Sequence, residues 1–223
     1  MHFMGLLKSL DELLYEVMSW LIFYPLTLWR VLRRPLVMMD YSDRELRQSA
    51  GEQYTDTLTP PLFLLISLLI SHLLELAFIG GNELVRSNHG LSALVKDDSS
   101  LVILRLVIFS VFPLMFAVRL VRAQKKRLTR ESLRPAFYSQ CYAAAPFALL
   151  IGIGTLLSTV HRFAWAVPLG LTILGATLLI YGAVQARWFA EHLNRSTLAG
   201  LGQASIAMTA SVVMLLLIAP LFA

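Results

Sequence analysis

Three ionisable residues inside long apolar stretches are the part of this sequence that could do chemistry. His72 and Glu75 are three residues apart, so a helix would place them on one face, and Arg105 lies in the next apolar stretch. Charges at membrane depth are costly, and they commonly face the protein interior or mark a pathway. The cluster therefore has two interpretations. It is a functional site, which would be a proton or ion relay or a headgroup-binding pocket, or it is a static interhelical pair. One Glu–Arg pair with one histidine lacks the chain of groups that a relay across ~30 Å requires, which favours the static pair.

The two charged members of this cluster are expected at matching depth. Glu75 lies five residues before Gly80, the outer end of its apolar stretch, and Arg105 lies four residues after Leu101, the outer start of the next. At the helical rise these separations are about 7.5 Å and about 6 Å. We therefore predict a charge-assisted Glu75–Arg105 pair, with unaided snorkelling of Arg105 to the outer headgroups as the alternative.

No catalytic motif accompanies the cluster. The chain has no Walker A sequence, no G-x-S-x-G, no H-E-x-x-H and no glycine-rich dinucleotide turn. No spacing of His, Asp and Glu resembles a metal site, and the single cysteine, Cys141, has no partner for an internal disulfide. The expectation is a protein that is not an enzyme, with no catalytic residue, no metal and no cofactor.

The elements that must position these residues are membrane-spanning helices. Of the 223 residues, 57% are hydrophobic and only 15% are charged, and the mean hydropathy is +0.67. The apolar residues come in runs of about 20, the length that a ~30 Å hydrocarbon core requires. Only helices suit such runs, because lipid cannot satisfy an exposed backbone. We predict an all-α polytopic membrane protein with a bundle of five transmembrane helices, at residues 60–80, 101–121, 135–160, 163–185 and 201–222.

The distribution of Lys and Arg predicts the orientation of this bundle. Fifteen basic residues fall in 1–59, 119–134 and 186–200, three fall on the alternate side, and Arg105 lies within a span. Cytoplasmic loops carry the excess of basic residues, so the N-terminus is expected in the cytoplasm and the C-terminus in the periplasm of a bacterial inner membrane. The same loops account for the net charge of +5, and we do not expect nucleic acid as a partner.

The first 59 residues form an N-terminal arm, distinct from the transmembrane domain at 60–223. From residue 6 to residue 24, Lys8, Glu12, Glu16 and Ser19 fall on one helical face, and leucines and Val17 fall on the other. Pro25 breaks the apolar run, so an amphipathic interfacial helix on the inner leaflet is favoured over a sixth span. A crossing by residues 17–32 is the alternative. Residues 36–59 are expected to form a polar linker with a turn of helix at 41–49.

Two groups of basic residues are candidates for contact with anionic lipid headgroups. One follows the interfacial helix and the other lies in the 119–134 loop. The alternative role of the loop is to anchor the topology of the bundle. The candidate lipid contacts are Arg30, Arg33, Arg34, Arg122, Lys125, Lys126 and Arg127.

Prolines and small residues add local expectations. Pro60, Pro61 and Pro135 should begin helices, whereas Pro113, Pro146 and Pro168 lie inside spans and should kink them. The glycines of Ile151-Gly-Ile-Gly154 should let helices approach closely. In the last span, a helix contact is expected along the small residues Gly202, Ser205, Ala207, Thr209 and Ser211.

The pattern resembles the Yip1-like family of five-span membrane proteins. The matching features are Arg34-Pro35 ahead of the first span, the number of spans, and Tyr142-Ala-Ala-Ala-Pro146, which is similar to the family's Tyr-x-x-x-Pro. The resemblance implies no catalytic residues, and in eukaryotes it implies association with small GTPases and membrane shaping. Residues 6–35 are also similar to small bacterial inner-membrane proteins labelled permease.

These observations favour a non-catalytic structural or interaction protein that organises the inner membrane. The alternative is a small transporter or permease component with an intramembrane polar site, although five spans do not divide into equal repeats. The expected partners are a bilayer with anionic headgroups, and a second copy of the chain or other membrane proteins.

Overall fold

The computed structural model describes residues 2–49, 51–79, 98–160 and 163–218, and the side chains of residues 11–49, 51–78, 106–160 and 163–218. The described residues form helices and no strand. Two helices belong to the N-terminal arm, α1 (His2–Arg33) and α2 (Pro35–Glu45). The other helices are α3 (Pro60–Ile79), α5 (Asp98–Ala123), α6 (Arg130–Thr159), α7 (Ala166–Leu193) and α8 (Thr197–Ile218).

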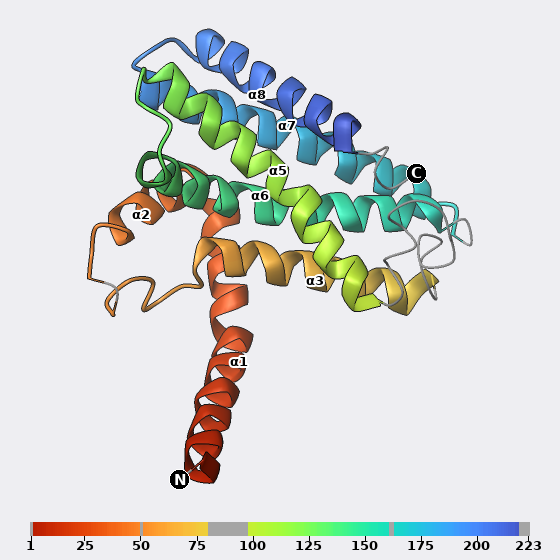
Figure 1. The fold of residues 1–223 in the computed structure, drawn as a ribbon. Helices are drawn as coiled ribbons and strands as arrows, with labels where there is room; N and C mark the ends of the chain where they lie inside the picture. The colour runs from red at the N-terminus through yellow and green to blue at the C-terminus, as the bar shows by residue number, and fades with distance from the viewer. Residues whose placement is uncertain (1, 50, 80–97, 161–162, 219–223) are drawn as a thin grey trace.

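The five helices that follow the arm make this a multi-pass membrane protein. Among the described residues, the five helices α3, α5, α6, α7 and α8 are each long and apolar enough to cross a bilayer, and α1 is not among them. The prediction of an all-α polytopic bundle is confirmed. The five helices alternate in direction, with α5 slanting across α6, and α1 extends away from the bundle roughly at right angles to α3 and α6 (Figure 1).

Helix α6 is the centre of the bundle. It packs against α3, α5 and α7 and also against both helices of the arm. Its residues 139–149 are all buried, and they include Ala143, Ala144, Ala145 and Ala148. Because alanine side chains are short, neighbouring helices can approach α6 from several directions at once. One hydrophobic cluster lies between α6, α3 and the arm, and a second lies between α6, α5, α7 and α8.

Two glycines lie where a neighbouring helix is in close contact. A Cβ added to Gly152 on α6 would lie 1.8 Å from Ser71 Oγ on α3, and a Cβ on Gly200 would lie 2.1 Å from the carbonyl oxygen of Ala186 on α7. The backbone contact at Gly200 accepts only glycine unless α7 and α8 move apart, whereas a Cβ at Gly152 requires the Ser71 side chain to move. The predicted close approach at the 151–154 glycines is therefore present.

The contact face of α8 contains two of the five predicted residues, Ala207 and Ser211. It consists of Gly200, Ala204, Ala207 and Ser211, which are all buried, whereas Gly202, Ser205 and Thr209 are exposed. The buried residues follow the helical spacing of four, three and four. Small residues cover most sides of α8, so the sequence alone did not single out the stripe that faces α7 and α5.

Proline behaves differently from the expectation at three positions. Pro25 lies inside α1, which continues to Arg33 rather than ending at residue 24. Helix α6 begins five residues before Pro135, because Thr129 and Ser132 form a capping box that satisfies the first turn. Pro168 is the third residue of α7. The N–H groups of the first turn have no acceptor within the helix, so proline removes no helical hydrogen bond here. Pro60, Pro113 and Pro146 lie where they were predicted.

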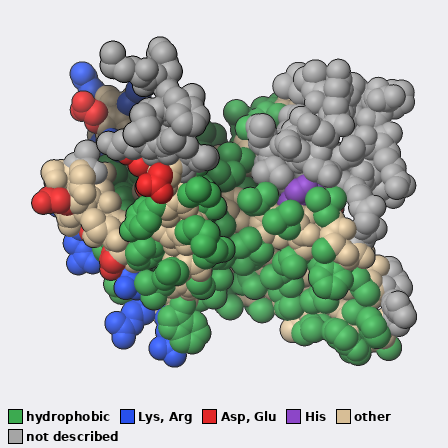
Figure 2. Space-filling view, turned by 90° about the horizontal axis from the view of Figure 1, so that it is seen from below, with side chains coloured by type: hydrophobic (Ala, Val, Ile, Leu, Met, Phe, Trp, Pro, Cys, Tyr) green, Lys and Arg blue, Asp and Glu red, His purple; other side chains and the backbone are tan. Residues whose placement is uncertain are grey.

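Charged side chains gather at one end of the bundle, which we call the basic end. It is formed by α2, the 124–129 loop and the turn at 194–196 that joins α7 to α8. Seen from below, Lys, Arg, Asp and Glu side chains gather at one side of the molecule, and the described surface on the other side is largely hydrophobic (Figure 2). This distribution is what a bilayer around the five helices requires.

Candidate functional site: the junction between the arm and the bundle

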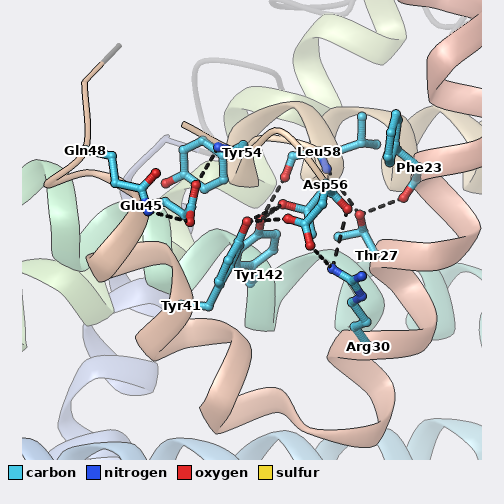
Figure 3. A network of polar contacts seen from close by, with 11 residues as sticks. Phe23, Thr27, Arg30, Tyr41, Glu45, Gln48, Tyr54, Asp56, Leu58 and Tyr142 are labelled. Atoms are coloured by element: carbon cyan, nitrogen blue, oxygen red, sulfur yellow. Dashed lines mark hydrogen bonds and ion pairs between the residues drawn. The ribbon is translucent and has the colours of Figure 1, made fainter. Parts of the chain in front are cut away.

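A network of polar contacts ties α1 to the segment before α3 (Figure 3). The Arg30 guanidinium donates from Nη1 to Asp56 Oδ2 at 2.7 Å and to the Asp56 carbonyl oxygen at 3.4 Å. On the other side of the same carboxylate, the Tyr41 hydroxyl donates to Oδ1 at 2.7 Å. Asp56 thus joins the last turns of α1 to α2 through one side chain.

The protonation of Asp56 follows from these contacts. Partial burial by itself would raise the pKa of this carboxyl, but the hydrogen bonds from Tyr41 and Arg30 and the charge of Arg30 outweigh it, so the pKa lies below its ordinary value. Burial and the neighbouring carboxylate raise the pKa of Tyr41, which keeps its hydroxyl available as a donor. The Asp56 carboxyl is therefore ionised at neutral pH, whereas the Tyr41 hydroxyl keeps its proton.

A second set of bonds connects the junction to the centre of the bundle. The Tyr142 hydroxyl on α6 donates to the Leu58 carbonyl oxygen at 2.7 Å and lies 3.3 Å from Thr57 Oγ1. The Leu58 N–H donates to Thr27 Oγ1 on α1 at 3.2 Å, and Thr27 in turn donates to the Phe23 carbonyl oxygen. One short segment, 56–58, therefore fixes α1, α2 and α6 relative to one another.

Glu45 closes the loop that leads into this segment. Its carboxylate is buried and accepts from the Tyr54 N–H at 2.6 Å and from Gln48 Nε2 at 3.2 Å. Tyr54 adopts a left-handed backbone conformation, with φ of 55°, and its side chain packs in the hydrophobic cluster beneath. Burial raises the pKa of Tyr54 to about 12, so its hydroxyl stays protonated beside Ser42.

A second polar cluster lies at the basic end, between α2, α6 and α7. Ser139 Oγ is 2.6 Å from Asp43 Oδ1 and 2.9 Å from the Met39 carbonyl oxygen, and His192 Nε2 lies 3.7 Å from Asp40 Oδ1. Burial raises the pKa of Asp43, although the Ser139 hydrogen bond and the charge of His192 act in the opposite direction. These contacts hold α2 against the ends of α6 and α7.

The intramembrane cluster predicted from the sequence is described in part. His72 is buried on α3, and Glu75 lines a cavity of about 380 Å³ together with Ser71, Thr155 and Thr159. Arg105 belongs to α5, but its side chain lies outside the described residues, and so does the predicted Glu75–Arg105 contact. Among the described residues no group of three His, Cys, Asp or Glu side chains could hold a metal ion.

The candidate lipid contacts occupy the arm and the basic end. Arg30 is held by Asp56, and the guanidinium carbon of Arg33 lies 4.1 Å from the centre of the Trp29 ring. Arg34 separates α1 from α2, and its side chain is exposed. The remaining candidates are also exposed: Arg122, Lys125, Lys126 and Arg127.

A buried amide pair was not anticipated from the sequence. Gln140 on α6 and Gln185 on α7 are both completely buried, and each amide nitrogen donates to the other's oxygen, at 3.1 Å and 2.6 Å. Reciprocal bonds of this kind satisfy two polar side chains where no water is available. A search for uncharged amides inside the apolar runs would have found both residues, although not their pairing.

Comparison of the chain with protein-family models, with curated proteins and with solved structures finds no match. The resemblance to Yip1-like proteins stays a prediction. The junction joins the N-terminal arm to the bundle through these contacts. It holds a long amphipathic helix in a fixed direction relative to a membrane-spanning bundle.

Proposed function

We propose that this protein is a non-catalytic component of a bacterial inner membrane that organises the cytoplasmic leaflet with its N-terminal helix. In this proposal the basic end faces the cytoplasm, α1 lies in the headgroup region of the inner leaflet, and the junction transmits the position of α1 to the bundle. The orientation is supported by the fifteen Lys and Arg residues on one side of the spans against three on the other.

The observation that carries the proposal is an apolar stripe on α1 that no described part of the chain covers. Its members are Leu14, Met18, Leu21, Trp29 and Leu32, and each is at least half exposed. They repeat at helical spacing, while Glu12, Glu16 and Ser19 lie on the opposite face. A stripe of this kind would be costly in water, and an inner leaflet covers it without a protein partner.

Aromatic and basic side chains at the end of α1 support the same placement. Trp29 is exposed, with Arg33 stacked on its ring, and Trp20 and Tyr24 lie on the side toward the bundle. Tryptophan and arginine side chains together suit the boundary between acyl chains and anionic headgroups. Lipids with anionic headgroups are therefore the proposed partner, and a second copy of the chain remains an expectation from the sequence.

The test is reconstitution of the full chain into vesicles of phosphatidylcholine with phosphatidylglycerol, followed by cryo-electron microscopy of vesicle shape. We expect the wild-type protein to narrow vesicles or draw tubules from them, because α1 wedges one leaflet. Leu21→Glu should abolish the effect by placing a charge on the stripe. Ser19→Glu adds the same charge on the polar face and should leave it intact. Unchanged vesicle diameters with wild-type protein, or equal loss in both variants, would contradict the proposal.

The second candidate function is transport, and the cavity between α3, α5 and α6 favours it. Ser71, Glu75, Thr155 and Thr159 bring a carboxylate and three hydroxyl groups to a space of about 380 Å³ inside a membrane-spanning bundle. If this cavity serves a proton or cation pathway, vesicles with an enclosed pH dye should show a protein-dependent proton flux. Glu75→Gln should remove that flux, whereas Glu131→Gln at the basic end should not.

A further inference from the structure

We propose that the groove between α5 and the first turns of α6 binds one anionic phospholipid, with its phosphate on two arginines and an acyl chain along the apolar wall. The groove has a volume of about 580 Å³, and Arg130 and Arg134 line one end of it. Neither arginine is among the lipid contacts predicted from the sequence. The site does not involve α1, so it requires only that α5 and α6 cross a bilayer.

The two arginines form a suitable receptor for a phosphodiester. They are four residues apart on α6, so their side chains lie on one helical face, and both are exposed. The guanidinium carbon of Arg134 is 5.3 Å from the centre of the Tyr138 ring, which limits its freedom. No described carboxylate forms an ion pair with either arginine. Planar guanidinium groups match phosphate oxygens in charge and in geometry.

The wall of the groove matches an acyl chain. On α5 it consists of Leu106, Val107, Val111 and Leu114, with Ser110 among them, and Phe137 contributes from α6. Leu106 and Leu114 are eight residues apart on α5, which corresponds to about 12 Å along the helix axis. Half of the ~30 Å hydrocarbon core is about 15 Å, so the stripe follows a chain through most of one leaflet.

The charge at the end of the groove favours an anionic lipid over other occupants. A zwitterionic headgroup brings its own ammonium toward two arginines, whereas phosphatidylglycerol brings only negative charge. A free phosphate would use the arginines alone and leave the apolar wall uncovered. A protein helix is about 10–12 Å wide with its side chains, and it would meet two unpaired guanidinium groups at the end of an apolar face.

The experiment measures immobilised lipid by electron spin resonance, with the full chain in phosphatidylcholine vesicles. Spin-labelled phosphatidylglycerol and spin-labelled phosphatidylcholine are the probes. The wild-type protein should immobilise the phosphatidylglycerol probe preferentially. Arg130→Gln with Arg134→Gln should weaken that preference by roughly 30-fold, since each basic residue near a headgroup contributes a factor of about five. Arg187→Gln with Arg195→Gln removes the same charge outside the groove and should keep most of the preference.

A second variant tests whether the groove holds the acyl chain. It leaves both arginines in place, so its result does not depend on whether the double arginine variant folds. Val107→Trp fills the groove without changing its charge, and it should reduce immobilisation of the phosphatidylglycerol probe. Equal losses in the two arginine pairs would overturn the proposal, because the effect would then be general surface charge. It would also be overturned if Val107→Trp had no effect while excess inorganic phosphate displaced the probe, because the arginines would then bind a free anion.

Discussion

The buried amide pair between α6 and α7 makes a quantitative prediction about how the bundle is held together. Replacing Gln140 by leucine removes both hydrogen bonds of the pair and leaves the buried Gln185 amide without this partner. A buried polar group without a partner costs about 1–3 kcal/mol, and single interhelical bonds in membranes average about 0.6 kcal/mol. We expect each single leucine variant to lose about 1–2 kcal/mol of unfolding free energy.

The double variant separates the bond from other effects of the substitution. With leucine at both positions no amide is left unsatisfied, and the two side chains can pack on each other. The loss in the double variant should be smaller than the sum of the single losses, with a coupling of about 1–2 kcal/mol. Gln124→Leu, in the half-buried loop after α5, is the matched control and should change stability by less than about 0.5 kcal/mol.

The assay is reversible unfolding in mixed detergent micelles, followed by tryptophan fluorescence. Trp188 lies on α7 one turn after Gln185 and is fully buried, so its share of the emission of the four tryptophans responds when α7 separates from α6. Fluorescence and circular dichroism should change together if unfolding is two-state. Additive losses in the double variant would refute the reasoning, because they would mean that the two amides do not depend on each other in the membrane.

Three further predictions concern helix contacts and the junction. Gly152→Ala should lower the unfolding midpoint because its Cβ would collide with Ser71, whereas Gly202→Ala, with open space around it, should not. The pKa of Asp56 is lower in the folded state than its ordinary value of 3.8. The contribution of Asp56 to folding stability is therefore fully present above pH 3.8 and is lost as the pH falls below it. Wild type should therefore lose stability relative to Asp56→Asn on acidification, and a constant difference would contradict this. Tyr142→Phe should loosen the junction and speed limited proteolysis between residues 46 and 57.

Much of the architecture could be predicted from the sequence because the bilayer imposes it. The length of the apolar runs sets the number of spans, and the hydrophobic solvent leaves helices as the only element. The ends of the helices were harder to predict from the sequence, since they depend on local hydrogen bonds such as the capping box of Thr129 and Ser132. Pro25 predicts the end of a helix, but packing of Tyr24 and Val31 on the bundle holds the helix on both sides of it.

The candidate site was harder to predict because it depends on long-range pairing. Arg30 and Asp56 are 26 residues apart, and Thr57 and Tyr142 are 85 apart, so no spacing rule connects them. Arg30 was assigned to lipid from its place in a basic run, whereas the folded chain gives it a carboxylate of its own. The Arg130 and Arg134 groove depends on how α5 crosses α6, and the sequence does not encode that crossing in any local pattern.

The central claim is that α1 lies in one leaflet and is held there by the junction, and the depth of α1 in the bilayer tests it most directly. The only native cysteine, Cys141, is fully buried, so single cysteines can carry spin labels at Leu14 and Leu21 on the stripe and at Glu12 and Glu16 opposite. Exposure to oxygen and to a water-soluble relaxant gives the depth of each label. We predict that the Leu14 and Leu21 labels lie about 5–10 Å into the boundary between headgroups and acyl chains while the Glu12 and Glu16 labels stay in water. A depth that increases steadily along α1 and passes the bilayer centre would contradict the account.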